Sequence, residues 1–143
     1  MSNVLAVCVS KNKGERKTPV EKVRLLLNHG IEGDAHAGNW HRQVSLLAQE
    51  SIEKMQKIGL SVAAGDFAEN ITTTGITLPE LPIGTKLQIG ETILKVTQIG
   101  KECHTRCAIY YQAGDCVMPK EGIFAMVLQD GEIKPGDTIE VRA

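Results

Sequence analysis

The chain has 143 residues, of which 42% are hydrophobic and 23% charged, and its formal net charge is -1. This length suits one domain, and the core must rest on aliphatic residues, because the chain has only one Trp, two Tyr and two Phe. The balanced charge argues against nucleic-acid binding, and the few aromatic residues argue against a stacking platform for single-stranded bases.

The first part of the chain alternates short apolar runs with polar loops. Residues 3–10 (NVLAVCVS) are rich in Val and predict a strand, in which Cys8 is a small buried hydrophobic residue. Residues 20–27 (VEKVRLLL) predict a second strand, and residues 28–43 are loop by composition. The apolar stretch at the N-terminus is too short for a signal peptide or a membrane span, which predicts a cytoplasmic protein with no membrane partner.

A helix is predicted immediately after a third strand. Val44 to Leu47 form the strand, and the apolar residues that follow recur at helical spacing. They are Ile52, Met55 and Ile58. This stripe predicts a helix that faces the core, and Gly59 predicts its end.

The second part of the chain is rich in turn signals. Residues 63–87 predict short strands and turns, and Gly90-Glu91 and Asp130-Gly131 each predict a two-residue hairpin. Pro135-Gly136-Asp137 marks another turn. These signals predict a mostly β fold: a single-domain β-barrel of short antiparallel strands with one or two helices, covering residues 1–143.

Residues 100–122 hold three of the four cysteines. A disulfide is the weakest interpretation in the cytoplasm, where thiols stay reduced. A zinc site is weakened by the spacing Cys103-x3-Cys107-x8-Cys116, which contains no Cys-x2-Cys pair. The third interpretation, a reactive sulfur, is the one that we favour.

The sequence from Cys103 to Gly114 has the composition of a short helix. Its first thiol would face unpaired backbone N–H groups and the positive end of the helix dipole, which favour the thiolate. Three basic residues lie nearby, namely Lys101, His104 and Arg106. Cys107 is four residues on and therefore on the same helix face, as a second thiol or, equally, as a core residue.

Two polar loops carry further candidates. Residues 30–38 (GIEGDAHAG) do not fit a dinucleotide fingerprint, but they could bind an anion, or Asp34 could cap a turn. His36 is a candidate ligand, whereas we expect His41 to be solvated.

In residues 65–72 (GDFAENIT), Glu69 and Asn70 could bind the edge of a heterocycle. The alternative is that Asp66 and Asn70 cap turns. No Ser-His-Asp arrangement has a local signature in this sequence, and paired carboxylates do not stand out.

In their order along the chain, these segments resemble the MOSC domain, named for the C-terminal domain of molybdenum cofactor sulfurase. Gly33, Asp34 and His36 are similar to the family's Gly-Asp-x-His motif. Residues 65–72 are similar to its Gly-Asp-x-x-x-Glu-Asn motif. Further similar segments are RQVSLL (42–47), IGTKLQIG (83–90), TQIGKEC (97–103) and the closing run from Gly122.

The resemblance implies a stand-alone module with a pyruvate-kinase-barrel-like fold and a functional cysteine at Cys103, which carries sulfur as a persulfide or ligates molybdenum. Many members have an Arg-x-Pro-Cys run where this chain has Gly100-Lys101-Glu102-Cys103. Lys101 or Arg106 would then replace that arginine. Members act in molybdenum cofactor sulfuration or as cofactor-dependent reductases.

The resulting hypothesis is a molybdenum cofactor-associated sulfur-carrier or sulfur-transfer domain. Cys103 would be the reactive thiol and Cys107 a resolving thiol. Phosphate would be held by Arg42, Lys101 and Arg106, and the pterin would be bound or oriented by His36, Glu69 and Asn70. Gly33 and Asp34 are further expected cofactor-binding residues. The expected partners are a molybdopterin-type ligand and a cysteine desulfurase or molybdoenzyme. The alternatives are a non-catalytic molybdopterin-binding module, a molybdenum-dependent reductase component and a zinc-stabilised interaction domain.

Overall fold

The structure is a computed structural model that describes residues 2–12, 16–59, 61–100 and 121–142. Within these ranges the chain is mostly β, with one α-helix, α1 (Gln49–Lys57), and one 3-10 turn, η1 (Leu78–Glu80). The strands are β1 (Asn3–Val9), β2 (Thr18–Val20), β3 (Val23–Leu26), β4 (Gly30–Ile31), β5 (Val44–Ala48), β6 (Ile71–Thr74), β7 (Lys86–Ile89), β8 (Thr92–Ile99), β9 (Ile123–Gln129), β10 (Gly131–Ile133) and β11 (Ile139–Arg142). The prediction of a mostly β chain is confirmed.

The strands form two sheets. The larger has the order β11-β7-β8-β9-β5-β6-β1-β2, and the smaller has the order β10-β3-β4. Strands β5 and β6 are parallel, so the expectation of antiparallel strands alone is wrong for this pair. The reason is that α1 follows β5 and carries the chain back to the same end of the sheet, as a parallel connection requires.

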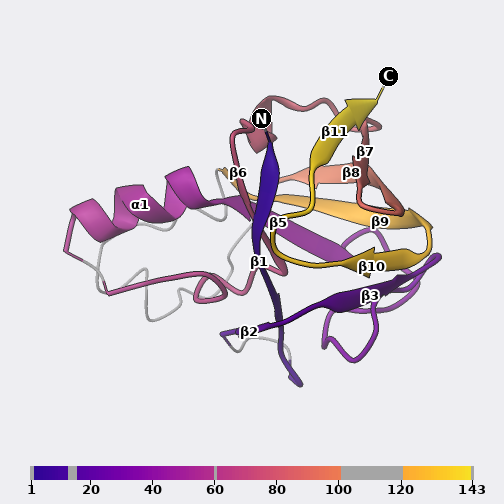
Figure 1. Cartoon of the computed structure of the whole chain (residues 1–143), viewed down its shortest axis with the longest axis horizontal. Helices are drawn as coiled ribbons and strands as arrows, with labels where there is room; N and C mark the ends of the chain where they lie inside the picture. The colour runs from indigo at the N-terminus through magenta and orange to yellow at the C-terminus, as the bar shows by residue number, and fades with distance from the viewer. Residues whose placement is uncertain (1, 13–15, 60, 101–120, 143) are drawn as a thin grey trace.

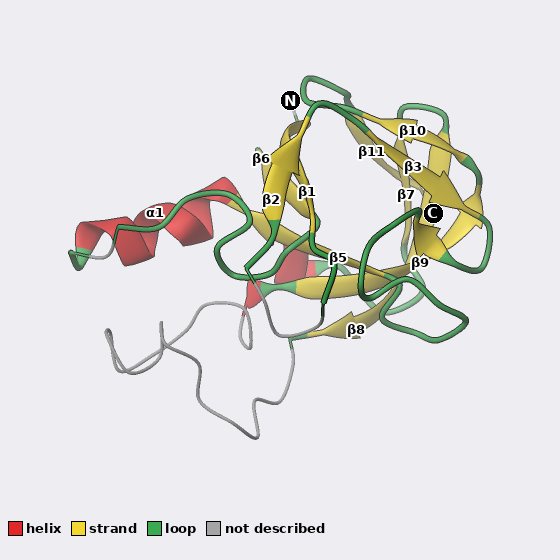
Figure 2. Ribbon diagram, turned by 90° about the horizontal axis from the view of Figure 1, so that it is seen from below, coloured by secondary structure: helices red, strands yellow, loops and turns green. Residues whose placement is uncertain are grey.

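The large sheet curves until its two ends approach each other. Strand β1, near one end of this sheet, lies beside the turn that precedes β11 at the other end. Asn3 of β1 and Thr138 of that turn form an isolated bridge. Val4 N donates to Asp137 O at 2.9 Å, and Gly136 N donates to Val4 O at 2.8 Å. Figures 1 and 2 show the strands around a common interior, with α1 to one side. The described residues do not form a closed strand ladder, so the barrel remains a prediction.

Two apolar clusters make the core. The larger lies between the sheets, and the smaller lies under α1, where Ile52 and Met55 pack with Phe67 and Phe124. The prediction of a core-facing stripe is confirmed for Ile52 and Met55. It is wrong for Ile58, which is 61% exposed because the helix ends at Lys57 and Ile58 is its C-cap.

The two expected hairpins have different outcomes. Gly90-Glu91 joins the paired strands β7 and β8, as predicted. Asp130-Gly131 does not make a hairpin, because β9 pairs with β5 and β8, whereas β10 pairs with β3 in the other sheet. Glycine suits the close approach at this position, since a Cβ at residue 131 would lie 3.0 Å from both Glu91 Cβ and Thr92 Cγ2.

The chain near residue 20 also differs from its prediction. The expected strand over 20–27 is two separate strands, β2 and β3, which belong to different sheets. The expected loop over 28–43 contains the short strand β4. The turn at Pro135-Gly136 is present, and Gly136 has a φ of 96°.

Gly65 holds the loop before β2 against the rest of the fold. Lys17 N donates to Gly65 O at 2.8 Å, and Gly65 has a φ of 90°. A Cβ at residue 65 would lie 2.2 Å from Lys17 O and 3.2 Å from Cys8 Sγ. Only glycine permits both the left-handed backbone and this close approach.

We predict that Gly65→Ala lowers the free energy of unfolding by on the order of 3 kcal/mol or more, because steric overlap adds to the backbone strain. The matched control is Gly84→Ala. Gly84 has a φ of 96° with nothing within 4 Å of its added Cβ, so strain alone should cost about 1 kcal/mol. Urea unfolding measures both variants, and equal losses would contradict this account.

Candidate functional site

Strand register brings two loops together at one end of β1. Val9 of β1 is opposite Thr18 of β2, so Ser10 and Lys17 follow as the next facing residues of the hairpin. Asp34 comes from the loop after β4, and Ala35 N donates to Ser10 O at 2.9 Å. Ser10 and Asp34, which are 24 residues apart in sequence, are also joined by a hydrogen bond from Ser10 N to the Asp34 carboxylate.

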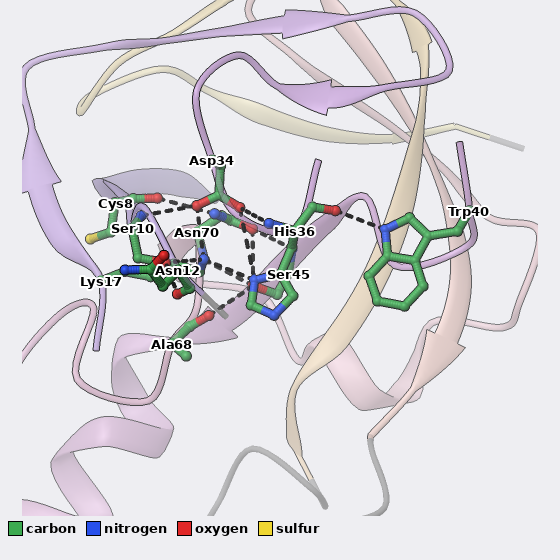
Figure 3. A network of polar contacts seen from close by, with 10 residues as sticks. All are labelled: Cys8, Ser10, Asn12, Lys17, Asp34, His36, Trp40, Ser45, Ala68 and Asn70. Carbon is green, nitrogen blue, oxygen red and sulfur yellow. Dashed lines mark hydrogen bonds and ion pairs between the residues drawn. The ribbon is translucent and has the colours of Figure 1, made fainter. Parts of the chain in front are cut away.

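A buried ion pair is the centre of this cluster (Figure 3). Lys17 Nζ lies 2.8 Å from Asp34 Oδ1, and both side chains are 0% exposed. The same ammonium lies 3.0 Å from Ser10 Oγ and 3.0 Å from His36 Nδ1. A buried ammonium needs this dense set of partners, because an unpaired charge in the interior is costly.

The Asp34 carboxylate is held in its ionised form. Burial would raise its pKa, but hydrogen bonds from Lys17, from Ser10 N at 3.0 Å and from His36 N at 3.1 Å outweigh burial, and the pKa lies below its usual value. The bond to His36 N closes a turn two residues on, so the predicted turn-capping role of Asp34 is confirmed.

His36 lies at the outer end of the cluster, with its side chain 23% exposed. Trp40 Nε1 donates to His36 O at 2.7 Å. The two rings are 6.5 Å apart at an interplanar angle of 7°, and Figure 3 shows them beside one another. The backbone of His36 is thus fixed on one side by Asp34 and on the other by Trp40.

A second polar group continues from Trp40. The Trp40 ring meets the His41 ring edge-on at 5.8 Å. His41 Nε2 and Arg42 Nε lie 2.9 Å and 3.1 Å from Gln98 Oε1. The Arg42 guanidinium also lies 5.2 Å from the centre of the Phe124 ring. Among the described residues, Arg42 forms its hydrogen bond through Nε. Its two Nη groups therefore remain available to a ligand.

Glu69 is a buried carboxyl with only internal partners among the described residues. It is 0% exposed and accepts from Thr72 Oγ1 at 2.9 Å and Phe67 N at 3.3 Å. Burial raises its pKa, and the hydrogen bonds only partly offset this. Burial, followed by the charge of Glu69, raises the pKa of Cys8 to about 12, so the prediction of a buried Cys8 is confirmed.

Asn70 joins three strands with its backbone and side chain. Its Oδ1 accepts from Ser45 N at 3.0 Å, and its Nδ2 donates to Cys8 O at 3.1 Å. The backbone N–H of Asn70 donates to Ser45 O, and its backbone C=O accepts a hydrogen bond from Cys8 N. The amide therefore extends the ladder from β6 to β5 and β1 at the point where regular pairing stops.

Asp66 of the same motif caps a turn, as predicted, because its Oδ2 accepts a hydrogen bond from Ala63 N at 2.9 Å.

The structure brings some predicted site residues together and separates others. Asp34 and His36 share one cluster, which Trp40 and His41 connect to Arg42. Gly33 has a φ of 83° and open space around its Cα. Glu69 and Asn70 are buried within the fold. The predictions for Lys101, Cys103, His104, Arg106, Cys107 and Cys116 lie outside the described residues.

Sequence reasoning missed three residues of this site. They are Lys17, Trp40 and Gln98. Lys17 stands in a polar loop where a lysine is normally solvated, and Gln98 stands in a strand with no motif around it. The chain's one tryptophan was a usable signal, since Trp40 lies between two candidate histidines.

The described ranges contain neither a metal-binding cluster nor a membrane-spanning helix. Residues 2–12, 16–59, 61–100 and 121–142 hold no cluster of three His, Cys, Asp or Glu that could bind a metal ion. In the same ranges no helix is long and apolar enough to cross a membrane.

We predict that Lys17→Met lowers the free energy of unfolding by about 3–5 kcal/mol, because it leaves the Asp34 carboxylate buried without a cation. Lys17→Met/Asp34→Asn should lose less than Lys17→Met alone, since no charge then remains. The control cycle is Lys22→Met with Glu132→Gln, an exposed pair at 3.6 Å, where coupling should stay below about 1 kcal/mol. Denaturant titration would contradict the account if both cycles gave the same coupling.

We predict that Glu69→Gln changes how stability depends on pH. Because the folded-state pKa of Glu69 is raised above 4.5, the wild type loses stability as pH rises from that value toward the folded pKa. The variant lacks this loss, so its stability relative to wild type should increase across that interval. Thermal unfolding at several pH values measures it, with the exposed Glu53→Gln as control. A flat difference would show that Glu69 does not titrate abnormally.

Known structures share this fold. The YuaD protein from Bacillus subtilis superposes with a TM-score of 0.81 at 19% identity, covering 99% of this chain and 96% of that one. YiiM from Geobacillus stearothermophilus gives a TM-score of 0.74 at 22% identity, covering 100% and 76%. YiiM from Escherichia coli gives 0.71 at 19% identity, covering 100% and 70%. At these identities the likeness concerns the fold.

Two sequence comparisons go further. YflK from Bacillus subtilis (strain 168) is 26% identical over 141 residues, which cover 90% of this chain. This chain spans 62% of the length of that relative. The model of the MOSC domain matches residues 33–140, which is more than half of the chain and includes both polar motifs. The chain therefore belongs to the MOSC domain family.

Proposed function

We propose that this chain is a sulfur-carrier or sulfur-transfer domain associated with the molybdenum cofactor, with Cys103 as the residue that carries a persulfide or ligates molybdenum. The MOSC family is associated with sulfur and ligand binding related to that cofactor. The matched range contains Asp34, His36, Arg42 and Cys103. We further propose that residues 1–143 are one domain, because Lys17 lies before the matched range and yet partners Asp34 within it.

The position of Arg42 carries the proposal. Gln98 accepts from Arg42 Nε and donates from its Nε2 to Gly100 O at 2.8 Å. Gly100 N donates to Gly122 O at 2.6 Å, so both ends of the cysteine segment start from this point. Cys103 is three residues after Gly100, and chain geometry keeps it within roughly 11 Å of that residue. This connection supports the proposal that the Nη groups of Arg42 and the thiol of Cys103 act on the same ligand.

The donor set suits an anionic ligand. A guanidinium binds phosphate oxygens through paired N–H groups, and Arg42 would do so together with Lys101 and Arg106. The same cations would favour the thiolate form of Cys103. When bound, the molybdenum cofactor would supply a metal that accepts a sulfur ligand. The residues of this chain would hold its phosphate, and His36 would orient its polar edge.

Glu69 and Asn70 would act on the pterin site by shaping it. Their side chains bind Thr72, Ser45 and Cys8, so in this proposal they support the loops that carry His36 and Arg42.

The proposed sulfur-transfer step is a thiol–persulfide exchange. The Cys103 thiolate attacks the terminal sulfur of a donor persulfide, the S–S bond of the donor breaks, and the donor cysteine leaves as a thiolate. Cys107 could later attack the Cys103 sulfur, which forms a disulfide and releases hydrosulfide. A cysteine desulfurase is the donor class that supplies such a persulfide.

We predict that anaerobic incubation with a cysteine desulfurase and cysteine adds one sulfur atom to Cys103, as measured by intact-mass and peptide mass spectrometry. Cys103→Ser should abolish the adduct. Cys8 is the internal control, because a buried thiol with a pKa of about 12 should carry none.

Three results would count against the proposal. They are no adduct, adducts on several thiols including Cys8, and stoichiometric zinc that is lost when Cys103, Cys107 and Cys116 are blocked. The last result would favour a zinc-stabilised domain. An adduct that forms but is never passed to an acceptor would favour a binding module over an enzyme.

A further inference from the structure

We propose that Lys17 is a positioning residue that fixes the tautomer of His36, so that the neutral His36 ring carries its proton on Nε2. The inference rests on contacts within the buried cluster. Lys17 Nζ is 3.0 Å from His36 Nδ1, and the lysine side chain is 0% exposed. A role of His36 in contacting the cofactor rests on the function proposed above, whereas the tautomer of His36 is a property of the ligand-free protein.

Counting donors and acceptors gives the direction of the bond. A lysine ammonium has three N–H donors and no lone pair. Three acceptors surround Nζ, namely Asp34 Oδ1 at 2.8 Å, Ser10 Oγ at 3.0 Å and His36 Nδ1 at 3.0 Å. Each proton then has one acceptor. His36 Nδ1 must be unprotonated to accept its bond, and the proton of the neutral imidazole therefore lies on Nε2.

The other charge states fit the contacts less well. A protonated Nδ1 would point an N–H at the ammonium, and two donors would face each other at 3.0 Å. The carboxylate does not offer that proton another acceptor, because Asp34 Oδ2 is 3.9 Å from Nδ1 and already accepts from His36 N at 3.1 Å. A neutral lysine amine would lose the ion pair with Asp34, which is fully buried.

The chemical consequence is a restriction on what His36 can bind. An Nε2–H group donates a hydrogen bond to an oxygen acceptor such as a phosphate, carbonyl or oxo group. It has no lone pair for a metal ion, and moving the proton to Nδ1 would break the contact with Lys17. In this tautomer the His36 ring can donate a hydrogen bond from Nε2 but cannot bind a metal ion through that atom.

The test is the ¹⁵N spectrum of the histidine rings in the ligand-free protein at neutral pH. Four histidines contribute, and the signal lost in His36→Gln identifies the ring of interest. We expect Nδ1 of His36 at the position of an unprotonated ring nitrogen and Nε2 at that of a protonated one. A protonated Nδ1, alone or with Nε2, would overturn the proposal whether or not Cys103 carries sulfur.

The role of Lys17 is tested by Lys17→Met/Asp34→Asn, which removes both charges together. The two ring nitrogens of His36 should move toward each other as the tautomers begin to average. Lys22→Met, on an exposed lysine, should leave them unchanged. An unchanged His36 ring in the double variant would overturn the role of Lys17. Should that variant not fold, Lys17→Arg keeps a donor toward Nδ1 and should preserve the wild-type pattern, whereas a reversed tautomer would refute it.

Zinc alone tests the restriction on ligands. Adding Zn²⁺ to the wild-type protein should leave both ring nitrogens of His36 in place, because Nε2 has no lone pair to offer. A shift of both nitrogens with loss of the Nε2 proton would show metal binding at His36 and would contradict the proposal.

Discussion

The buried ion pair between Lys17 and Asp34 is the constraint on which the arrangement of the site depends. Two charges without solvent exposure are tolerated only when each has close partners of the right kind. Here the partners come from two separate loops, the connection between β1 and β2 and the loop after β4. Ser10 contributes an N–H to Asp34 and a hydroxyl to Lys17. The loops cannot separate without stranding a charge, so the pair holds His36 at a defined place.

The two polar motifs of the sequence have opposite positions in the fold. Asp34 and His36 lead from the interior to the surface, whereas Glu69 and Asn70 remain inside and complete the junction of β6 with β5 and β1. Their composition is similar, and only the strand pairing distinguishes them. Polar residues in a motif can therefore serve the architecture on which a site is built, even when their side chains could also bind a ligand.

Sequence reasoning succeeded where the controlling interactions are local. The strand at 3–10, the helix with Ile52 and Met55, and the hairpin at Gly90-Glu91 follow from patterns within about ten residues. Asp130-Gly131 has the same local signal as a hairpin, but β9 and β10 each pair with strands far away in sequence. The tertiary pairing overrides the turn preference there, and no local pattern reveals it.

Lys17 is the clearest case of information that the sequence does not display. Its loop is polar and rich in charge, so a solvated lysine is the reasonable expectation. Its partner is 17 residues away, and the pairing depends on the registers of two different sheets. By contrast, the Gly-Asp-x-His spacing was visible, because Asp34 binds the backbone two residues on within a single turn.

The contacts also indicate different roles for the buried cluster and for Arg42 in the proposed site. The charges of Lys17 and Asp34 offset one another, so the buried ion pair adds little net charge to the proposed site. In the proposed site, attraction for an anion would then come from Arg42 and the basic residues before and after Cys103. Gln98 links Arg42 to Gly100, and Trp40 with His41 links it to His36. In the proposed site Arg42 would therefore attract an anionic ligand, while the buried cluster fixes the position of His36.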